Sequence, residues 1–155
     1  MAMKAEFINP FLDSIVNVLE TMAGVKVTPG KPQRKLEDAA AGDVTGLIGM
    51  ASSEIRGSLA ITFSSEAIFD VVKRMLGEEV REINSTVTDL VGEITNMVTG
   101  GAKRLLEEMG YDFDMAIPAV VAGKNHRISH KSGGPKIIIP FFIDAGKFYV
   151  EICFE

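Results

Sequence analysis

The sequence predicts an α+β fold in which an antiparallel sheet is covered by two long helices and a shorter one. Two long segments repeat apolar residues with the period of a helix, and the last third of the chain alternates with the period of a strand. Turn residues separate the expected strands, as in an antiparallel sheet with helices on it. With 155 residues and 46% hydrophobic content, the chain is expected to form a single domain spanning residues 1–155.

The first long helix is expected from Glu6 to Ala23, where apolar residues recur at helical spacing and Gly24 is a natural stop. We interpret Asn9 as its cap and Pro10 as its first helical position. The elements that follow are expected to be a short strand and turn at 26–34, a connector at 36–43, a β-hairpin of 44–51 and 55–63, and the shorter helix from Ser64 or Ser65 to Leu76.

The second long helix is expected to begin at a cap, Asn84 or Ser85, and to end at Gly110. An apolar segment follows at 115–122, where Pro118 predicts a strand start, an edge or a bulge. Strands are then expected at 136–143 and 147–154, and the alternation of the last strand predicts that Cys153 is buried. Glycines within the first hairpin, Gly46, Gly49 and Gly57, predict bulges or the close approach of another element.

Composition excludes several classes of function. The net charge of −5 and the pI near 5.1 argue against nucleic-acid binding, which needs a basic surface. A single cysteine forms no internal disulfide, which fits a reducing compartment. The chain has no signal peptide and no apolar run of the ~20 residues that a membrane helix requires, so a cytoplasmic protein without a membrane partner is expected.

The second long helix has an unusual polar face. Its exposed positions and their flanks are expected to be Asp89, Glu93, Asn96 and Gly100, with Gly92, Thr95 and Thr99 beside them. Glycine costs a helix about 1 kcal/mol relative to alanine, and asparagine and threonine cost up to about 0.7 kcal/mol. Repeated use of poor helix formers on one face indicates a functional site.

Glu93 and Asn96 are three residues apart and therefore neighbours on this face. An asparagine side chain donates and accepts hydrogen bonds at once, which suits it to orienting a water molecule, and Gly100 leaves the space beside it open. The spacing by itself favours the other interpretation, an ordinary solvated face that carries an incidental Glu-x-x-Asn.

The two halves of the sequence repeat one pattern. Gly24 and Pro32 follow Asn9 by 15 and 23 residues, and Gly110 and Pro118 follow Asn96 by 14 and 22. Each asparagine lies on a long amphipathic helix that precedes a β-hairpin. A pseudo-two-fold internal repeat is one interpretation of this pattern, and a chance match is the other.

These residues together resemble the CheC/CheX/FliY phosphatases of bacterial chemotaxis. The resemblance lies in Asp89-x-x-x-Glu93-x-x-Asn96, in Pro118 and in the repeat, and the opening residues 6–12 are similar to the CheX branch. It implies a phosphatase that hydrolyses the phospho-aspartate of a CheY-like response regulator. By position, Asn96 would orient the attacking water and Glu93 would pair with the regulator's active-site lysine, with Asp89 and Gly100 at the edge of the contact.

The resemblance also implies that the Mg²⁺ belongs to the phosphorylated partner, so the chain would need no cofactor or metal of its own. Relatives of the CheX type pair through their sheets, which implies a homodimer, and the strands at 137–142 and 148–154 are apolar enough to supply an edge. A non-enzymatic adaptor that binds the regulator without dephosphorylating it is the alternative function. Both Glu93 and Asn96 being present favours the enzyme.

Two further constellations are not assigned a catalytic role. Glu6 and Asn9 copy the Glu-x-x-Asn spacing, but Pro10 and the lack of an acidic residue at position 2 depart from the family pattern. His126 and His130 are four residues apart, which suits a metal only on a helix. In an extended segment they lie ~13 Å apart, so solvated or partner-contacting histidines are expected.

Overall fold

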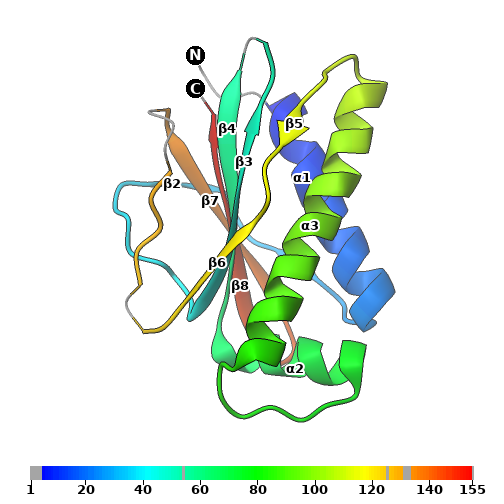
Figure 1. The fold of residues 1–155 in the computed structure, drawn as a ribbon, viewed down its shortest axis with the longest axis vertical. Helices are drawn as coiled ribbons and strands as arrows, with labels where there is room; N and C mark the ends of the chain where they lie inside the picture. Colours follow the sequence, from blue (N-terminus) through cyan, green and yellow to red (C-terminus); the bar gives the residue numbers. More distant parts are fainter. Residues whose placement is uncertain (1–4, 54, 125, 131–133, 155) are drawn as a thin grey trace.

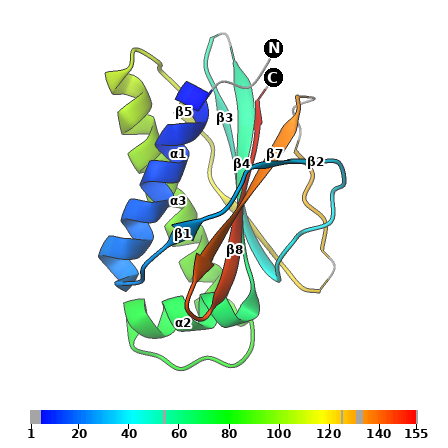
Figure 2. The ribbon, with the colours of Figure 1, turned by 180° about the vertical axis from the view of Figure 1, so that it is seen from behind.

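The computed structural model describes residues 5–53, 55–124, 126–130 and 134–154. Its helices are α1 (Ala5–Val18), which a π-helical turn at Leu19–Ala23 continues, α2 (Ser65–Leu76) and α3 (Ser85–Glu108). Its strands are β1 (Thr28–Pro29), β2 (Gln33–Lys35), β3 (Val44–Ala51), β4 (Arg56–Phe63), β5 (Asp114–Met115), β6 (Ala119–Ala122), β7 (Lys136–Ile143) and β8 (Gly146–Phe154). The helices lie on one side of an antiparallel sheet, which confirms the predicted α+β class (Figures 1 and 2).

The sheet has an internal pseudo-two-fold symmetry. The long strands run in the order β7-β8-β4-β3, so β4 and β8 form the central pair. The short strands of each half of the chain pair with a long strand of the other half. β1 and β2 pair with β7, and β5 and β6 pair with β3. The predicted repeat is therefore confirmed as a repeat of structure, with α1 and α3 as its equivalent helices.

The equivalent helices α1 and α3 cross in close contact. Ser14 and Gly101 occupy equivalent positions, because each lies five residues after its asparagine, Asn9 or Asn96. They meet at the crossing: the Ser14 Oγ donates to the Val98 carbonyl at 2.7 Å, and a Cβ at Gly101 would collide with that Oγ. The small residues let the two helix backbones approach closely.

The hydrophobic core lies between the sheet and the helices. Alternate residues of the central strands face it, including Leu59 and Ile61 of β4 and Val150 and Ile152 of β8. The rings of Phe141 and Phe148 stack with centroids 5.0 Å apart. Among the described helices, none combines the length and the hydropathy that crossing a bilayer requires.

Local sequence signals placed most elements correctly. Ser64 caps α2 by accepting from the Ala67 N–H, and Gly77 ends it in the left-handed conformation with φ 72°. The first hairpin pairs from Val44↔Phe63 to Ala51↔Arg56 without a bulge, so its glycines do not mark bulges. Pro118 separates β5 from β6, and Cys153 is buried in β8, as predicted.

The predicted cap of the first helix is wrong, although its predicted range, Glu6 to Ala23, agrees with α1 and the turn that continues it. Among the described residues α1 already begins at Ala5, so Pro10 lies inside the helix and Asn9 is not its cap. The reason is the burial of Phe7, whose ring packs 4.7 Å from Tyr111 and 5.6 Å from Phe154 between centroids. This aromatic cluster fixes the turn that precedes Pro10, and the proline's φ is compatible with the helix.

The proposed edge strands are also wrong. β8 lies between β7 and β4, and β7 is covered along most of its outer side by β1 and β2. The edges are instead the short strands of each half, β1 with β2 and β5 with β6. The apolar sequences of β7 and β8 reflect this interior position in the sheet.

Candidate functional site

The predicted site lies on the outer face of α3. Asn84 caps this helix by accepting from the Val87 N–H at 3.2 Å. Val91 and Ile94 are fully buried against the sheet, and their burial fixes the rotation of the helix. The four predicted site residues, Asp89, Glu93, Asn96 and Gly100, are all exposed on the opposite face, as expected.

The polar side chains of this face have no partners among the residues that the structure describes. Asp89, Glu93 and the Asn96 carboxamide form no hydrogen bond or ion pair with any residue that the structure describes. Their donors and acceptors are therefore available to a second molecule. The Asn96 carbonyl of the backbone does accept from the Thr99 Oγ1 at 3.1 Å, but this bond leaves the side chain untouched.

The predicted flanks of the face differ from expectation, because Thr95 and Thr99 are buried. The Thr95 Oγ1 donates to the Val91 carbonyl at 2.7 Å and the Thr99 Oγ1 to the Thr95 carbonyl at 2.8 Å. Such bonds to the preceding turn satisfy a threonine hydroxyl inside a core. Gly46 of β3 makes room for this packing, since a Cβ there would overlap the Thr95 Oγ1. The sheet therefore supports α3 directly behind Asn96.

The two adjacent glycines of α3 have different surroundings. A Cβ at Gly100 would meet open space, so nothing within the described protein requires glycine there. Gly101 faces the crossing with α1 and packs against Ser14. The structure thus explains Gly101 by packing, whereas Gly100 has no internal explanation.

A hollow of about 500 Å³ borders the acidic side of this face, and the sequence did not predict it. Its walls come from the π-helical turn after α1, from the end of α2 and from α3. The residues that line it include Met22, Met75, Leu76, Met97, Asp89 and Glu93. Three separate segments meet here, so no single window of the sequence predicts the hollow.

The expectation of solvated histidines is wrong. The His130 side chain is buried on the face of the sheet away from the helices, where its Nε2 lies 3.2 Å from the Glu151 Oε1 and its Nδ1 bonds the Ser58 hydroxyl. The Lys35 Nζ reaches the other Glu151 oxygen at 2.6 Å. His126 bonds the Thr45 hydroxyl at 2.6 Å. Both rings serve as hydrogen-bond partners within the structure.

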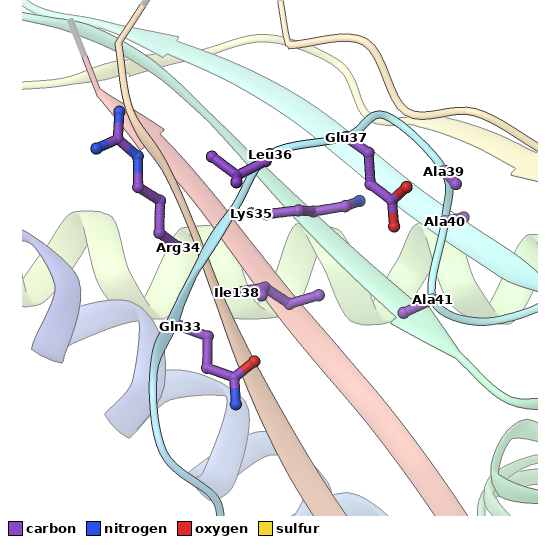
Figure 3. Close-up of a pocket in the computed structure, with 9 residues that line it drawn as sticks. All are labelled: Gln33, Arg34, Lys35, Leu36, Glu37, Ala39, Ala40, Ala41 and Ile138. Carbon is purple, nitrogen blue, oxygen red and sulfur yellow. The ribbon is translucent and has the colours of Figure 1, made fainter.

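Burial opposes the ionisation of Glu151, but hydrogen bonds from His130 and Lys35 outweigh it and hold its pKa below the usual 4.5. Lys35 belongs to the wall of a hollow of about 430 Å³ under the connector 36–43, where Arg34 and Lys35 extend in different directions from β2 (Figure 3). This hollow is distant from α3 and holds none of the predicted site residues. The described His, Cys, Asp and Glu side chains form no cluster of three that could hold a metal ion.

Known proteins match this chain over most of its length. The CheY-P phosphatase CheX of Thermotoga maritima is 29% identical over 142 residues, which cover 91% of this chain and 90% of the relative. A CheC-like superfamily protein from Shewanella sp. PV-4 has a similar structure, with a TM-score of 0.93 and 58% identity over 99% of both chains. The crystal structure of the CheX–CheY–BeF₃–Mg²⁺ complex from Borrelia burgdorferi is also similar, with a TM-score of 0.82 and 28% identity over 98% of this chain and 99% of that chain.

The family model described as chemotaxis phosphatase CheX matches residues 44–142. That range contains the first hairpin, α2, α3 and the strands up to β7, and therefore the whole exposed face of α3. The chain belongs to the chemotaxis phosphatase CheX family.

Proposed function

We propose that this chain hydrolyses the phospho-aspartate of a CheY-type response regulator, with Asn96 and Glu93 as the residues that act on it. The observation that carries the proposal is the pair of side chains itself, exposed side by side on α3 with no described partner in the protein. The family and the relative named CheY-P phosphatase support the activity. The relative solved as a complex with CheY, BeF₃ and Mg²⁺ supports the partner.

In the proposed reaction Asn96 orients a water molecule in line with the phosphoryl group, as a glutamine does in GTP hydrolysis. The water oxygen bonds to phosphorus, and the bond from phosphorus to the regulator's carboxylate oxygen breaks. The carboxylate is regenerated, and inorganic phosphate leaves as H₂PO₄⁻ with both protons of the water. The carboxamide accepts from the water and donates to a phosphoryl oxygen. Among the described residues of the exposed face, no hydroxyl, thiol or amine is paired with a general base, and this mechanism needs no covalent nucleophile.

Glu93 holds the regulator in register by pairing with its active-site lysine. The Mg²⁺ bound by the regulator neutralises charge that develops on the phosphoryl oxygens. Asp89 extends the acidic surface towards the same contact. Gly100 leaves space in which the regulator approaches the backbone of α3, which accounts for a glycine that internal packing does not require.

The competing function is an adaptor that binds the regulator without hydrolysing its phosphate. The two differ in stoichiometry, so the test is the loss of phosphate from a phosphorylated CheY-type regulator at increasing amounts of this chain. Acceleration at a hundredth of the regulator's concentration supports an enzyme. An effect that requires equimolar protein supports the adaptor and contradicts the proposal.

We further propose a homodimer that acts in the cytoplasm, where response regulators are phosphorylated. The edges β1 with β2 and β5 with β6 are the strands available for pairing, and Ile117, beside β6, is 92% exposed. α3 stays accessible in such a dimer because it lies on the helical layer. Sedimentation at micromolar concentration tests this, and a species at only the 16.7 kDa monomer mass contradicts it.

A further inference from the structure

The hollow beside Glu93 has an apolar floor that internal packing does not fill. Met22 is 51% exposed and Leu76 is 49% exposed, and both line it together with Met75 and Met97. Large apolar side chains gathered at one concave place on a protein surface mark an interaction site. Methionine is common in such places because its flexible thioether adapts to the shape of what it contacts.

The hollow is continuous with the proposed catalytic face. Asp89 and Glu93 form part of its lining, and Asn96 lies on the same helix, one position before Met97. A regulator whose lysine pairs with Glu93 must therefore cover the rim of the hollow. The π-helical turn that carries Met22 adds to this interpretation, since such turns occur frequently at functional sites.

We infer that this hollow takes an apolar side chain of the phosphorylated regulator, presented beside the lysine that pairs with Glu93. The inference rests on the proposed function and adds a second anchor to it. Two acidic groups without described partners and five apolar side chains line the hollow, so the complementary surface carries a cation next to an aromatic or long aliphatic group.

This arrangement separates binding from catalysis: the hollow between the turn after α1, α2 and α3 binds the regulator, and Asn96 on α3 acts on the water. Asn96 acts on the water and governs the rate of the chemical step. The hollow makes the same contact before and during hydrolysis, so it strengthens binding without changing that step. Regulators that lack the apolar side chain are bound weakly, which gives the chain a means to select among regulators that share one phosphorylation chemistry.

The test uses the double variant Met22→Gln with Leu76→Asn, which keeps side-chain size and removes the apolar contact. Met109→Gln is the matched control, because Met109 is 46% exposed at the far end of α3, outside the hollow. The two variants and Asn96→Ala are assayed for hydrolysis of a phosphorylated CheY-type regulator. Binding is measured by calorimetry with the same regulator loaded with Mg²⁺ and beryllium fluoride.

The double variant is expected to raise KM and Kd about tenfold, the factor that corresponds to a loss of about 1.4 kcal/mol, with kcat unchanged. Met109→Gln should match the wild type, and Asn96→Ala should lower kcat while its Kd stays the same. Unchanged KM and Kd in the folded double variant overturn the inference and leave the phosphatase function standing. Wild-type binding without hydrolysis overturns the function, and the Kd of the double variant still decides the inference.

Two further outcomes also count against it. If the double variant changes the sedimentation of this chain from dimer to monomer and binds the regulator normally, the hollow holds a second copy of the chain. If the wild type binds no CheY-type regulator in its beryllium fluoride form, the hollow has no such occupant. Thermal unfolding of each variant confirms that the comparison is made between folded proteins.

Discussion

Asn96 is exposed in the middle of α3, where asparagine is a poorer helix former than alanine. We therefore expect Asn96→Ala to leave the free energy of unfolding unchanged or to raise it by up to about 0.7 kcal/mol. If the carboxamide positions the attacking water, the same change lowers the rate of phospho-aspartate hydrolysis by about 10²–10³. Denaturant unfolding and phosphate release measure the two effects separately.

Asn9→Ala is the matched control, because Asn9 is the exposed asparagine at the equivalent position of α1. It should leave hydrolysis unchanged. Glu93→Ala should weaken both binding and rate, since it removes the carboxylate that we propose pairs with the regulator's lysine. An Asn96→Ala protein that is unfolded would make the residue structural, and one that is folded and fully active would place the chemistry elsewhere.

The two neighbouring glycines of α3 provide a second prediction. Gly100→Ala should stabilise the isolated chain by about 0.5–1 kcal/mol, because the added methyl group meets open space and alanine favours the helix. It should also raise KM for the regulator, which approaches the backbone there. Gly101→Ala should destabilise the chain, because the methyl group displaces the Ser14 hydroxyl from its bond to Val98.

Thermal unfolding and steady-state hydrolysis of both variants test this contrast. Ser14→Ala removes the colliding hydroxyl, so adding it to Gly101→Ala should recover part of the lost stability. If Gly100→Ala stabilises the fold and hydrolyses the regulator normally, Gly100 does not border the contact.

The exposure of a single residue is predictable from the sequence where it depends on one helix alone. The exposure of Glu93 and Asn96 follows from periodicity alone, because the buried stripe of α3 determines the face opposite to it. The predicted exposure of Thr95 and His130 is wrong, because their polar atoms find hydrogen-bond partners inside the fold and both side chains are buried. The hydroxyl of Thr95 bonds within its own helix, and His130 meets Glu151, which is 21 residues away in sequence.

At the scale of elements, β2 is a strand of three residues that a buried ion pair ties to the sheet. The side chains of Lys35 and Glu151 are 7% and 1% exposed, so removing one partner leaves a charge without full compensation. Lys35→Met should lower the free energy of unfolding by about 3 kcal/mol, the low end for a broken buried pair, because His130 still bonds Glu151. Chemical denaturation measures the loss.

Lys103→Met is the control of the same type, because Lys103 makes an exposed pair with Glu107 at 3.9 Å on α3. Such pairs contribute about 0.3–0.5 kcal/mol. Equal effects of the two substitutions would show that the Lys35 pair does not anchor β2.

Glu151 also makes the stability of the sheet depend on pH. Its pKa is lower in the folded chain than the usual 4.5, so the unfolded chain takes up the proton first as the pH falls. The stabilisation is complete above that value and is lost as the pH decreases through the folded pKa. Glu151→Gln removes this titration, so its melting temperature should fall less steeply than that of the wild type between pH 5 and pH 3. Parallel curves for both proteins would contradict the assignment.

The boundaries of elements with local signals were predicted well, whereas the order of the strands in the sheet was not. The caps Ser64 and Asn84 and the stop Gly77 lie within a few residues of what they terminate. The place of β8 at the centre of the sheet depends on pairing with β4, whose residues lie about ninety positions earlier, as in Ala60↔Glu151. Apolar composition indicates a buried strand but does not distinguish an interior strand from an edge awaiting a partner.

For the whole molecule we predict that Mg²⁺ is needed for hydrolysis and not for the fold. A chelator should abolish the acceleration of phosphate loss, because the metal belongs to the regulator, and leave the melting temperature of this chain unchanged. Restoring Mg²⁺ should recover hydrolysis. The Mg²⁺ concentration that gives half recovery should match the affinity of the regulator alone for Mg²⁺. A melting temperature that falls on chelation would indicate a metal in this chain and contradict the prediction.

The exchange of short strands between the two halves has a consequence for how such a molecule arises. Because β1 and β2 complete the second half and β5 and β6 complete the first, neither half closes its own part of the sheet. Two separate copies of one half-length polypeptide would close the same sheet about a true two-fold axis. In such a dimer the positions of Ser14 and Gly101 would be the same residue, in contact with its own copy in the other chain. The present chain holds both halves in one polypeptide, with α2 between them, so the equivalent helices α1 and α3 can carry different residues. α1 has a proline beside its asparagine and packs against α3 at Ser14, while α3 carries Glu93 and Asn96 exposed on its outer surface.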